Sequence, residues 1–528
     1  MTWSGSIPLG LAFKPRRELG RILKKGRPSD LKVGVFLPMP YSAAVNSVFM
    51  HLAYSYLNSI EGVRAFRYVY DAKEDVVEAL DLNLSPKKLD VLMISASFEL
   101  DYLYVARALA GLGILPEGGE GRPLIIVGGV APTANPLPLA RIADAVVVGE
   151  AEPVFDRVID CMGSADPLRR LSEEEHIVTF PPEGVKRRAI VHNLDDAITP
   201  ERQVHPLDEE PTYGHGIRVE VSRGCRRFCA FCLEGHATFP LRCRSLDRLK
   251  GLISRGLETS PKRRVVFYSL SFFDVPHSEE LLRWLISEGV EYSIPSLRPD
   301  YLSESRIELV RCGGQNTLTV APETLLPDVS CSIGKCVSSD HLESILDHAA
   351  AKGFRHVKLY LITGFPSEDA ELSVRAVGDL IKGFLKGRRV PPKFIRLSIN
   401  PLIPKPWTPF QYLPAYHVKQ REKNLEVFRR YLSGRFVEIE TYSVEWSFVQ
   451  AVIALGDTAV SDLIVDLGMR GVSLGSFRRV IRESGLSRLA YIMKGWSEPP
   501  WMKYLDLGID RRYLETRFRI LNPNPSHE

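Results

Sequence analysis

The sequence predicts an α/β protein with an N-terminal Rossmann-like domain, a central partial (β/α)6 TIM-type barrel and a mostly helical C-terminal region. Two observations carry this prediction. Apolar runs of strand length alternate with helical patterns over two separate stretches, and a charged, proline-containing span divides them. Apolar strands that alternate with helices indicate parallel sheets covered on both faces. The 528 residues are also too many for one ordinary domain.

Composition and charge exclude several classes of protein. Hydrophobic residues make up 45% of the chain and charged residues 25%, which excludes disordered, collagen-like and coiled-coil chains. No run approaches the roughly 18 apolar residues that a transmembrane segment needs. The 68 Lys and Arg exceed the 64 Asp and Glu by too little to indicate a nucleic-acid partner on charge alone.

The eight cysteines are few for this length and unevenly placed. The first 160 residues contain none, whereas Cys225, Cys229 and Cys232 fall within eight positions. This distribution differs from a secreted disulfide framework. It favours a cysteine-ligated metal site in a reducing cytoplasm.

Residues 1–30 form a basic N-terminal arm. Arg16 and Arg17 are adjacent, but no apolar h-region follows them, so we expect no export signal. We interpret the arm as a solvated segment or a short surface helix rather than a lipid- or RNA-binding patch.

Residues 31–165 predict the Rossmann-like domain. Strand candidates lie at 31–37, 89–95, 124–127 and 145–148, and helical patterns include 46–58 and 102–111. Ligands of such sheets bind at the carboxyl ends of the strands. The residues at these ends are Ser95, Ser97, Gly128, Gly129, Gly149 and Glu150.

A connector at 166–213 follows, in which we expect a short hairpin from the extended segments 177–180 and 189–192. The alternation resumes over 214–414, the predicted barrel, whose chemistry should lie at the C-terminal ends of its strands. Its six strand candidates are 217–222, 265–269, 291–295, 317–321, 356–361 and 394–399. Residues 415–528 predict a mostly helical region, with helical patterns at 418–432, 446–455 and 460–467.

The segment 220–232, EVSRGCRRFCAFC, carries the strongest chemical signal. Its C-x3-C-x2-C spacing follows the first strand of the predicted barrel. Three thiolates on one tight loop can bind three irons of a cubane [4Fe-4S] cluster and leave the fourth iron open for a substrate or cofactor. The alternatives are a zinc site with Cys243 or His236 as fourth ligand, redox-active thiols and structural cysteines.

With Phe231 before its last cysteine, this motif resembles the radical SAM superfamily. Further segments resemble one branch of that superfamily, in which an N-terminal cobalamin-binding-like domain precedes the barrel. They are SLR at 296–298, TVAPE at 319–323, KLYLITGFP at 358–366, NPLIPKPWTPFQ at 400–411, and Pro500-Trp501 with Asp506-Leu-Gly508 in the tail. The resemblance covers nearly the whole chain from residue 31.

The resemblance implies an enzyme that reductively cleaves S-adenosylmethionine (SAM) at a [4Fe-4S] cluster held by Cys225, Cys229 and Cys232. The cleavage gives methionine and a 5′-deoxyadenosyl radical, which abstracts hydrogen from the substrate. A reductant protein of the flavodoxin or ferredoxin type is implied as the electron donor. The protein's own task is to bind, orient and shield these groups.

The resemblance also implies which residues contact SAM. Phe231 is expected near the adenine, together with Gly364 and Pro366, unless these two only form a tight turn. Ser296 and Arg298 are expected at the ribose or the carboxylate, since a guanidinium pairs with a carboxylate through two donors.

Two further strand ends complete the implied SAM site. Glu323 is expected to accept from the ribose or the amino group, and the alternative for Arg298 and Glu323 is a mutual or local salt bridge. Ser269 and Ser271 occupy the place where many relatives have a Gly-Gly-Glu run for the SAM amino group. The sequence departs from that run here.

Cobalamin is the third cofactor that the resemblance brings in. Residues 38–46, after the first strand, have no Asp-x-His-x-x-Gly motif, and the first histidine is His51, so a lower-axial histidine from this loop is absent. Either cobalamin is held without a protein ligand, by shape and backbone contacts at the strand ends, or the pocket is vestigial and the domain only covers the barrel. The residues expected to make those contacts are Ser95, Ser97, Gly128 and Gly129.

Two chemistries are therefore open, cobalamin-assisted methyl transfer and cobalamin-free hydrogen abstraction. A methylthiotransferase is disfavoured, because its second three-cysteine cluster would lie in the cysteine-free first 160 residues. The substrate is unknown and could be a small molecule, a lipid or a tRNA. The alternative to an enzyme is an iron–sulfur or zinc protein that binds SAM or nucleic acid without turnover.

Weaker signals complete the analysis. Cys312, Cys331 and Cys336 are loosely spaced, and we expect free or buried thiols rather than an auxiliary cluster. We expect His236 to be an ordinary surface histidine, and the alternative is a role next to the cluster ligands or the substrate. Lys405 either reaches a phosphate or a radical intermediate or has a structural role.

Overall fold

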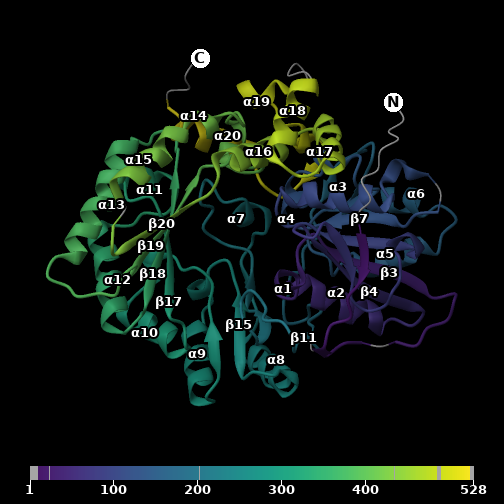
Figure 1. Cartoon of the computed structure of the whole chain (residues 1–528), viewed down its shortest axis with the longest axis horizontal. Helices are drawn as coiled ribbons and strands as arrows, with labels where there is room; N and C mark the ends of the chain where they lie inside the picture. The colour runs from purple at the N-terminus through teal and green to yellow at the C-terminus, as the bar shows by residue number, and fades with distance from the viewer. Residues whose placement is uncertain are drawn as a thin grey trace.

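The structure is a computed structural model and describes residues 10–22, 24–119, 121–200, 202–432, 434–484 and 489–523. Two α/β regions lie side by side, and the C-terminal helices lie along one edge of the molecule and reach the N-terminal region (Figure 1). None of the helices in these ranges has the length and apolar character of a membrane span.

One eight-stranded sheet forms the N-terminal region, in the order β1-β5-β4-β3-β6-β7-β8-β9. The five strands from β4 to β8 in this order are parallel, whereas β5 and β9 run antiparallel to β4 and β8. The bounds are β1 (Gly10–Phe13), β3 (Leu31–Leu37), β4 (Val63–Asp71), β5 (Val76–Ala79), β6 (Val91–Ser95), β7 (Leu124–Gly128), β8 (Ala145–Val147) and β9 (Ile177–Thr179).

This sheet is covered on both faces, as its apolar strands predict. Along β3, Val33 and Val35 belong to one hydrophobic core and Phe36 to the other, because successive side chains of a strand point to opposite faces. The first core includes residues of α1 (Tyr41–Ala44), α2 (Val48–Ser59), α5 (Phe155–Met162) and α6 (Pro167–Ser172). The second includes residues of α3 (Asp101–Leu112) and α4 (Val130–Ala134).

Two parallel sheets, β12-β15-β16 and β17-β18-β19-β20, stand where the sequence predicts a partial barrel. A bridge between Leu297 and Val320 links them. No pairing joins β12 to β20 among the described strands, so the barrel does not close. The bounds are β12 (Ile217–Glu220), β15 (Arg264–Tyr268), β16 (Glu291–Ser293), β17 (Thr317–Glu323), β18 (His356–Thr363), β19 (Ile395–Pro401) and β20 (Val437–Thr441).

Helices separate these strands in sequence. Along β18, Val357, Leu359 and Leu361 are buried in the core, while Lys358 and Tyr360 face the interior cavity between the sheets. The helices are α7 (Leu233–Ala237), α8 (Leu246–Thr259), α9 (Ser278–Ser287), α10 (Glu304–Cys312), α11 (Pro327–Ser332), α12 (Ser339–Ala351), α13 (Ala370–Leu385), α14 (His417–Gln420) and α15 (Glu422–Leu432).

The C-terminal helices join the two regions. Helix α17 packs on α3 so closely that a Cβ on Gly468 would lie 2.8 Å from the carbonyl carbon of Ala106. Asn135 donates hydrogen bonds to the carbonyl oxygens of Ala454 and Gly456, at 3.0 and 2.7 Å. The elements are α16 (Val444–Ala454), α17 (Ala459–Arg470), α18 (Leu474–Ser484), α19 (Tyr491–Lys494), β21 (Leu505–Asp506) and α20 (Arg511–Leu521).

Three expectations about the chain's organisation differ from the structure. The part of the basic arm that the structure describes contains β1 and β2 (Glu18–Leu19) instead of a solvated segment or helix, and Lys14 and Arg16 are paired with buried Glu78. Residues 1–9 lie outside the described residues. The C-terminal region, for which the sequence predicts mostly helices, also contributes a strand, β20, which pairs in parallel with β19.

The connector contains no hairpin between 177–180 and 189–192. Instead β9 extends the N-terminal sheet beyond β8, and Ala189 forms a bridge with Gly149. The short strand β10 (Lys186–Arg187) pairs with β21, and β11 (His205–Pro206) pairs with β2. The backbone N–H and C=O groups of each extended segment therefore pair with a strand that is distant in sequence, and the two segments do not pair with each other.

Candidate functional site

The loop that carries the three cysteines begins after β12 and β13 (Ser222–Arg223) and ends at α7. Gly224 at its start has φ +83°, and a Cβ there would lie 2.2 Å from the carbonyl oxygen of Pro240. Only glycine fits this position, so the chain must turn sharply just before Cys225.

The structure brings the three cysteines to one end of α7. A Cβ on Gly235 would lie 3.6 Å from Cys232 Sγ and 3.9 Å from Cys225 Cβ, so these two flank the helix start. Cys229 Sγ accepts a hydrogen bond from Arg298 Nη1 at 3.1 Å. Burial raises the pKa of the Cys225 thiol and raises that of Cys232 to about 12, so a metal must displace their protons to bind.

This thiol set fits a cubane cluster, in which each thiolate binds a different iron and the three sulfurs need not converge on one point. Within the described residues, no three His, Cys, Asp or Glu side chains converge as a single metal ion requires. The zinc alternative depends on such convergence. His236, one of its candidate ligands, uses Nδ1 to bond the carbonyl oxygen of Cys232 at 2.8 Å.

His236 is buried, whereas we expected a surface histidine. Its ring lies 5.3 Å from that of Phe228 and 6.2 Å from that of Tyr513. Burial lowers the pKa of His236 to about 4. Our expectation was wrong because α7 turns this side chain inward, against Phe228 of the cysteine loop and Tyr513 from a distant part of the chain.

Arg298 follows β16 and faces the cysteine loop. Its Nε and Nη2 donate to the carboxylate of Asp300 at 3.0 and 3.1 Å, and Nη2 also lies 3.5 Å from the carbonyl oxygen of Gly334. Together with the Cys229 contact, these bonds hold the guanidinium beside the loop. Arg298 thus forms a local ion pair with Asp300 in this structure and is not bonded to Glu323.

Glu323 ends β17 with φ +68°, a left-handed backbone that costs energy for any residue but glycine. Its carboxylate accepts from Lys335 Nζ at 2.7 Å, and both side chains are buried. The same Nζ lies 5.9 Å from the centroid of the Phe231 ring. Lys335 therefore stands between two of the residues that the sequence assigns to SAM.

Residues 363–368 form a tightly bonded turn after β18. The buried carboxylate of Glu368 accepts from the backbone N–H groups of Gly364 and Phe365 and from the hydroxyl of Thr363. Gly364 has φ +99°, and its carbonyl oxygen lies 2.6 Å from His417 Nε2. These bonds fix the backbone at Gly364 and Pro366, where adenine is expected. The Phe365 ring reaches Phe231, with 6.3 Å between centroids.

The three predicted serines lie at the ends of neighbouring strands. Ser269 Oγ is 2.7 Å from Ser222 Oγ and accepts from the backbone N–H of Ser271 at 3.2 Å. Ser269 and Ser296 line a cavity of about 1280 Å³ between the sheets, together with Glu234 of α7. Ser271 is buried and is not part of this lining.

Arg223 connects the cysteine loop to the N-terminal domain. It binds Glu220 at 2.8 Å, and Glu150 and Glu152 at 2.9 Å each. Glu150 also pairs with Arg242, at 2.8 Å. Because Glu150 and Glu152 follow β8, this network fixes the strand ends of one region against the cysteine loop of the other.

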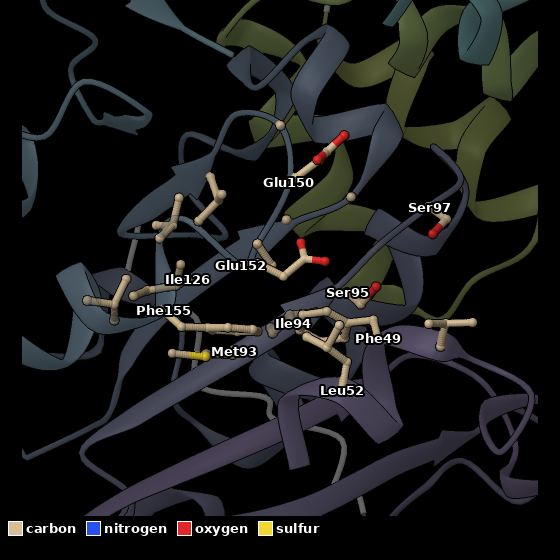
Figure 2. A pocket seen from close by; sticks show the side chains of 18 of the residues that line it. Phe49, Leu52, Met93, Ile94, Ser95, Ser97, Ile126, Glu150, Glu152 and Phe155 are labelled. Atoms are coloured by element: carbon tan, nitrogen blue, oxygen red, sulfur yellow. The ribbon is translucent and has the colours of Figure 1, made fainter. Parts of the chain in front are cut away.

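A second cavity, of about 270 Å³, opens at the carboxyl ends of the N-terminal strands. Figure 2 shows apolar side chains such as Phe49, Met93 and Phe155 gathered on one side of it, across from the carboxylates of Glu150 and Glu152. All four residues that the sequence assigns to cobalamin line it. They are Ser95, Ser97, Gly128 and Gly129.

The two glycines serve this cavity differently. Gly129 has φ +130°, and a Cβ there would lie 2.2 Å from the carbonyl oxygen of Ala96, so the backbone needs a glycine. Gly128 has no such constraint, since its Cβ would meet only Val147, at 3.7 Å. Neither the backbone conformation nor the packing therefore requires a glycine at position 128. The absence of a side chain there enlarges the cavity.

His51 has no free nitrogen for a metal. Its Nε2 lies 2.8 Å from the carbonyl oxygen of Val45, and its Nδ1 accepts from the backbone N–H of Val204 at 3.2 Å. Burial lowers the pKa of His51 well below its usual range. The side chain thus bridges two backbone segments as a neutral ring.

Sequence reasoning missed two groups and misjudged a third. Arg223 and Glu152 carried a signal, since Glu-x-Glu after a predicted strand end and an arginine beside the cysteine motif are charged groups at ligand-binding edges. Lys335 carried none. Cys331 and Cys336, expected as thiols, form a disulfide because the turn after α11 brings their Cα atoms to 4.0 Å, whereas Cys312 is free and exposed.

Lys405 has a structural contact in this fold. Its Nζ donates to buried Glu99 at 2.5 Å, and Gln450 donates to the same carboxylate at 2.7 Å. The three residues come from the loop after β19, the loop after β6 and α16, so they join all three parts of the chain.

Two family models match the chain, "Radical SAM proteins, N-terminal" over residues 50–178 and "Radical SAM superfamily" over residues 219–374. An uncharacterized protein of Methanocaldococcus jannaschii is 26% identical over 436 residues, covering 81% of this chain and 89% of that protein.

A solved structure with a similar fold is the radical S-adenosylmethionine methyltransferase TsrM from Kitasatospora setae, with cobalamin and a [4Fe-4S] cluster bound. Its TM-score is 0.51 at 11% identity, covering 86% of this chain and 99% of that chain. The cobalamin-dependent S-adenosylmethionine radical enzyme OxsB has a TM-score of 0.49 at 16% identity, covering 66% of this chain and 52% of that chain.

The family matches fall on both α/β regions, and the second includes the three cysteines of the loop before α7. The likeness to TsrM extends over most of the chain and concerns its fold. Membership in the superfamily implies a [4Fe-4S] cluster and SAM as cofactors. This chain is therefore a radical SAM enzyme, in which a region that matches the N-terminal family model precedes the region that carries the three cysteines.

Proposed function

We propose that this enzyme holds its [4Fe-4S] cluster on Cys225, Cys229 and Cys232, binds SAM at the open iron, and uses cobalamin in a methyl transfer. The observation that carries the proposal is the apolar cavity at the N-terminal strand ends. Its rim carboxylates bind Arg223, two residues before Cys225. A cobalamin held there would lie next to the cysteine loop.

The chain's residues fit an apolar ligand at this position. Aromatic and aliphatic side chains line one side of the cavity, and Gly128 leaves space that neither backbone geometry nor packing requires. Such a lining with few polar groups is typical of cofactor sites. Since His51 is committed to two backbone contacts, the corrin would be held without a protein ligand from the first loop.

The groups around the cysteine loop are arranged to hold SAM. The cofactors supply reductive cleavage of SAM and the carrier of the methyl group, with an electron from a flavodoxin- or ferredoxin-type donor. Phe231 and the fixed turn at Gly364 and Pro366 offer an apolar face for the adenine. Arg298, which Asp300 holds beside the loop, brings a positive charge that favours a carboxylate, and Glu323 offers an acceptor to a hydroxyl or ammonium group.

Reconstitution with hydroxocobalamin tests the cobalamin assignment. Purified enzyme is incubated with the cofactor anaerobically and desalted, and retained cobalamin is measured by absorbance against protein concentration. We expect about one equivalent in the wild type, because an apolar lining that buries most of a ligand slows its release. Gly128→Leu fills the cavity and should abolish retention while the iron content stays unchanged.

Gly475→Leu is the matched control, because Gly475 is exposed, lies on α18 and would meet only Ser473 Oγ at 3.8 Å. It should retain cobalamin like the wild type. No retention by the wild type would contradict cobalamin-assisted methyl transfer and leave direct hydrogen abstraction as the chemistry. Equal retention by Gly128→Leu and the wild type would place the cofactor elsewhere.

A further inference from the structure

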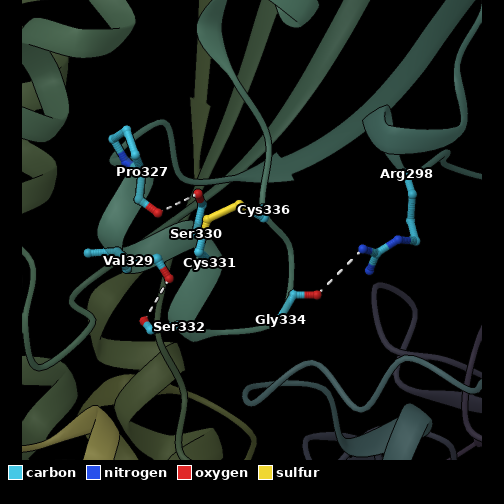
Figure 3. The surroundings of a disulfide bond; sticks show 8 residues. All are labelled: Arg298, Pro327, Val329, Ser330, Cys331, Ser332, Gly334 and Cys336. Carbon is cyan, nitrogen blue, oxygen red and sulfur yellow. Dashed lines mark hydrogen bonds between the residues drawn. A yellow bond between two sulfur atoms is a disulfide. The ribbon is translucent and has the colours of Figure 1, made fainter.

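Cys331 and Cys336 close a small ring at the end of α11. The disulfide joins residues five positions apart (Figure 3). Both cysteines are exposed. An exposed disulfide is open to attack by a thiolate, and exposed disulfides are more often labile or regulatory than buried ones. No other pair of cysteines in the described chain is bonded.

The backbone of this ring touches the cysteine loop. The carbonyl oxygen of Ile333 accepts from the backbone N–H of Ala230 at 3.0 Å. The carbonyl oxygen of Gly334 lies 3.5 Å from Arg298 Nη2 and 3.7 Å from Cys229 Sγ. Figure 3 shows the contact between Gly334 and Arg298 across the gap. Two of the groups proposed for the cluster and SAM thus already have a partner in the ring.

The side chain of Lys335, which also belongs to the ring, binds a third residue of the proposed SAM site, Glu323. Its Nζ is 2.7 Å from Glu323 Oε1, and the two side chains are only 7% and 10% exposed. It also lies 5.9 Å from the Phe231 ring. SAM carries an ammonium group and ribose hydroxyls, which are the donors that Glu323 would otherwise accept. Lys335 and SAM therefore compete for one buried carboxylate.

We propose that Cys331 and Cys336 form a thiol–disulfide switch that controls access of SAM to its site. With the disulfide closed, the ring holds Lys335 on Glu323 and Gly334 on Arg298, and SAM binds weakly. Reduction opens the ring, lets Lys335 withdraw from Glu323, and leaves the Glu323 carboxylate free to accept from SAM. The inference rests on the proposed SAM site at Glu323 and Arg298.

The switch needs a dithiol as its reductant. One thiolate of the dithiol attacks a sulfur of the Cys331–Cys336 bond and forms a mixed disulfide, and the second thiol then displaces the first. Two electrons and two protons pass to the ring, which ends as two thiols, while the dithiol becomes a disulfide. A reducing environment, which the cluster also needs for SAM cleavage, would thus open the site.

The test measures SAM affinity against the redox state of the ring. Cluster-loaded enzyme is equilibrated anaerobically in mixtures of reduced and oxidised dithiothreitol. Alkylation and mass spectrometry give the fraction of Cys331–Cys336 disulfide, and equilibrium dialysis with labelled SAM gives the Kd per cluster. We expect the Kd to rise about tenfold or more as the disulfide forms. In that state Lys335 takes the hydrogen bond to the Glu323 carboxylate that SAM would otherwise make, and hydrogen bonds to charged groups are among the stronger ones.

Three variants separate the switch from other effects. A Cys331→Ser and Cys336→Ser double variant should bind SAM tightly in every buffer. Lys335→Met keeps the disulfide but removes the competing cation, so its SAM affinity should depend little on redox state. Cys312→Ser, which removes the exposed free cysteine, should behave as the wild type.

Equal SAM affinity of the wild type in its oxidised and reduced forms would overturn the switch and leave the SAM site standing. The absence of the disulfide across the whole buffer series would overturn it as well. Failure of every form to bind SAM, with iron content intact, would overturn both the switch and the proposed SAM site.

Discussion

Arg223→Met should destabilise the contact between the N-terminal domain and the cysteine loop. Arg223 binds Glu150, Glu152 and Glu220 at 2.8 to 2.9 Å, and its side chain is 15% exposed. Removing one partner of a buried ion pair costs about 3 to 5 kcal/mol, because a charge is left buried without compensation. Methionine retains much of the side-chain volume, so the loss is mainly electrostatic.

The size of the effect follows from which carboxylates keep a cation. In the variant, Glu150 retains Arg242 at 2.8 Å and Glu220 retains Arg244 at 3.4 Å. Glu152 loses the one ion pair that the described residues give it. We therefore expect the lower end of the range, about 3 kcal/mol. For a domain of this size that corresponds to a fall in Tm of about 6 to 12 °C.

Thermal unfolding followed by circular dichroism measures this change in Tm. Hydrogen exchange with mass spectrometry should show faster exchange at residues 218–245, where the contact is lost. Arg187→Met is the matched control, because Arg187 is 69% exposed and lies 3.6 and 3.8 Å from its two carboxylate partners. Exposed pairs of this kind contribute about 0.5 kcal/mol or less. Equal Tm values for the two variants would refute the role of Arg223 as the link between the regions.

Two further predictions concern buried polar groups. Lys405→Met leaves Glu99 with only the Gln450 hydrogen bond. We therefore expect the free energy of unfolding to fall by about 3 kcal/mol and hydrogen exchange at residues 97–101 to become faster. Unchanged exchange at these residues would contradict an interdomain role of Lys405. Burial lowers the pKa of His417 from 6.5 to about 4, so the folded protein keeps this ring neutral at a pH where the unfolded chain protonates it. The free energy of unfolding therefore falls by about 3 kcal/mol as the pH drops from above 6.5 to 4. His417→Gln should show a weaker dependence in urea denaturation between pH 4 and 7, and an unchanged one would exclude His417 as its source.

Apolar strands were predictable because their signal is local. The run at 31–37 has the same bounds as β3, and the strand ends that the sequence assigns to a ligand do line one cavity. The prediction used only the rule that parallel strands end at a common edge. Long-range pairing was not needed for it.

The strands that sequence analysis missed carry charges whose partners are distant in the chain. Strand β4 contains Arg67, which is fully buried and bonded to Glu18 and Asp81. Strand β20 alternates Glu438 and Glu440 with apolar residues. Glu440 pairs with Lys358 of β18, and Glu438 pairs with Lys393 in the turn before β19. A charged residue, considered by itself, indicates a solvent-exposed position. A sequence pattern therefore does not reveal a buried strand whose charged residues form ion pairs with residues that are distant in the chain.

The candidate site divides in the same way. The cysteine spacing predicted that three thiolates within eight residues share one loop, and all three lie between β13 and the start of α7. Lys335 could not be predicted, because its contact with Glu323 depends on how the turn after α11 folds back on β17. Nor did the sequence indicate that Cys331 and Cys336 would be paired rather than free.

The most direct test of the central claim is the iron content and electron paramagnetic resonance spectrum of anaerobically reconstituted enzyme, measured with and without SAM. The proposal predicts about four irons per chain and a reduced-cluster signal that SAM changes, because the open iron binds it. Cys229→Ala should lose the iron and the signal, whereas Cys312→Ala, at an exposed free cysteine, should keep both. Full iron content in Cys229→Ala together with an unaltered response to SAM would contradict the assignment of the cluster to this loop.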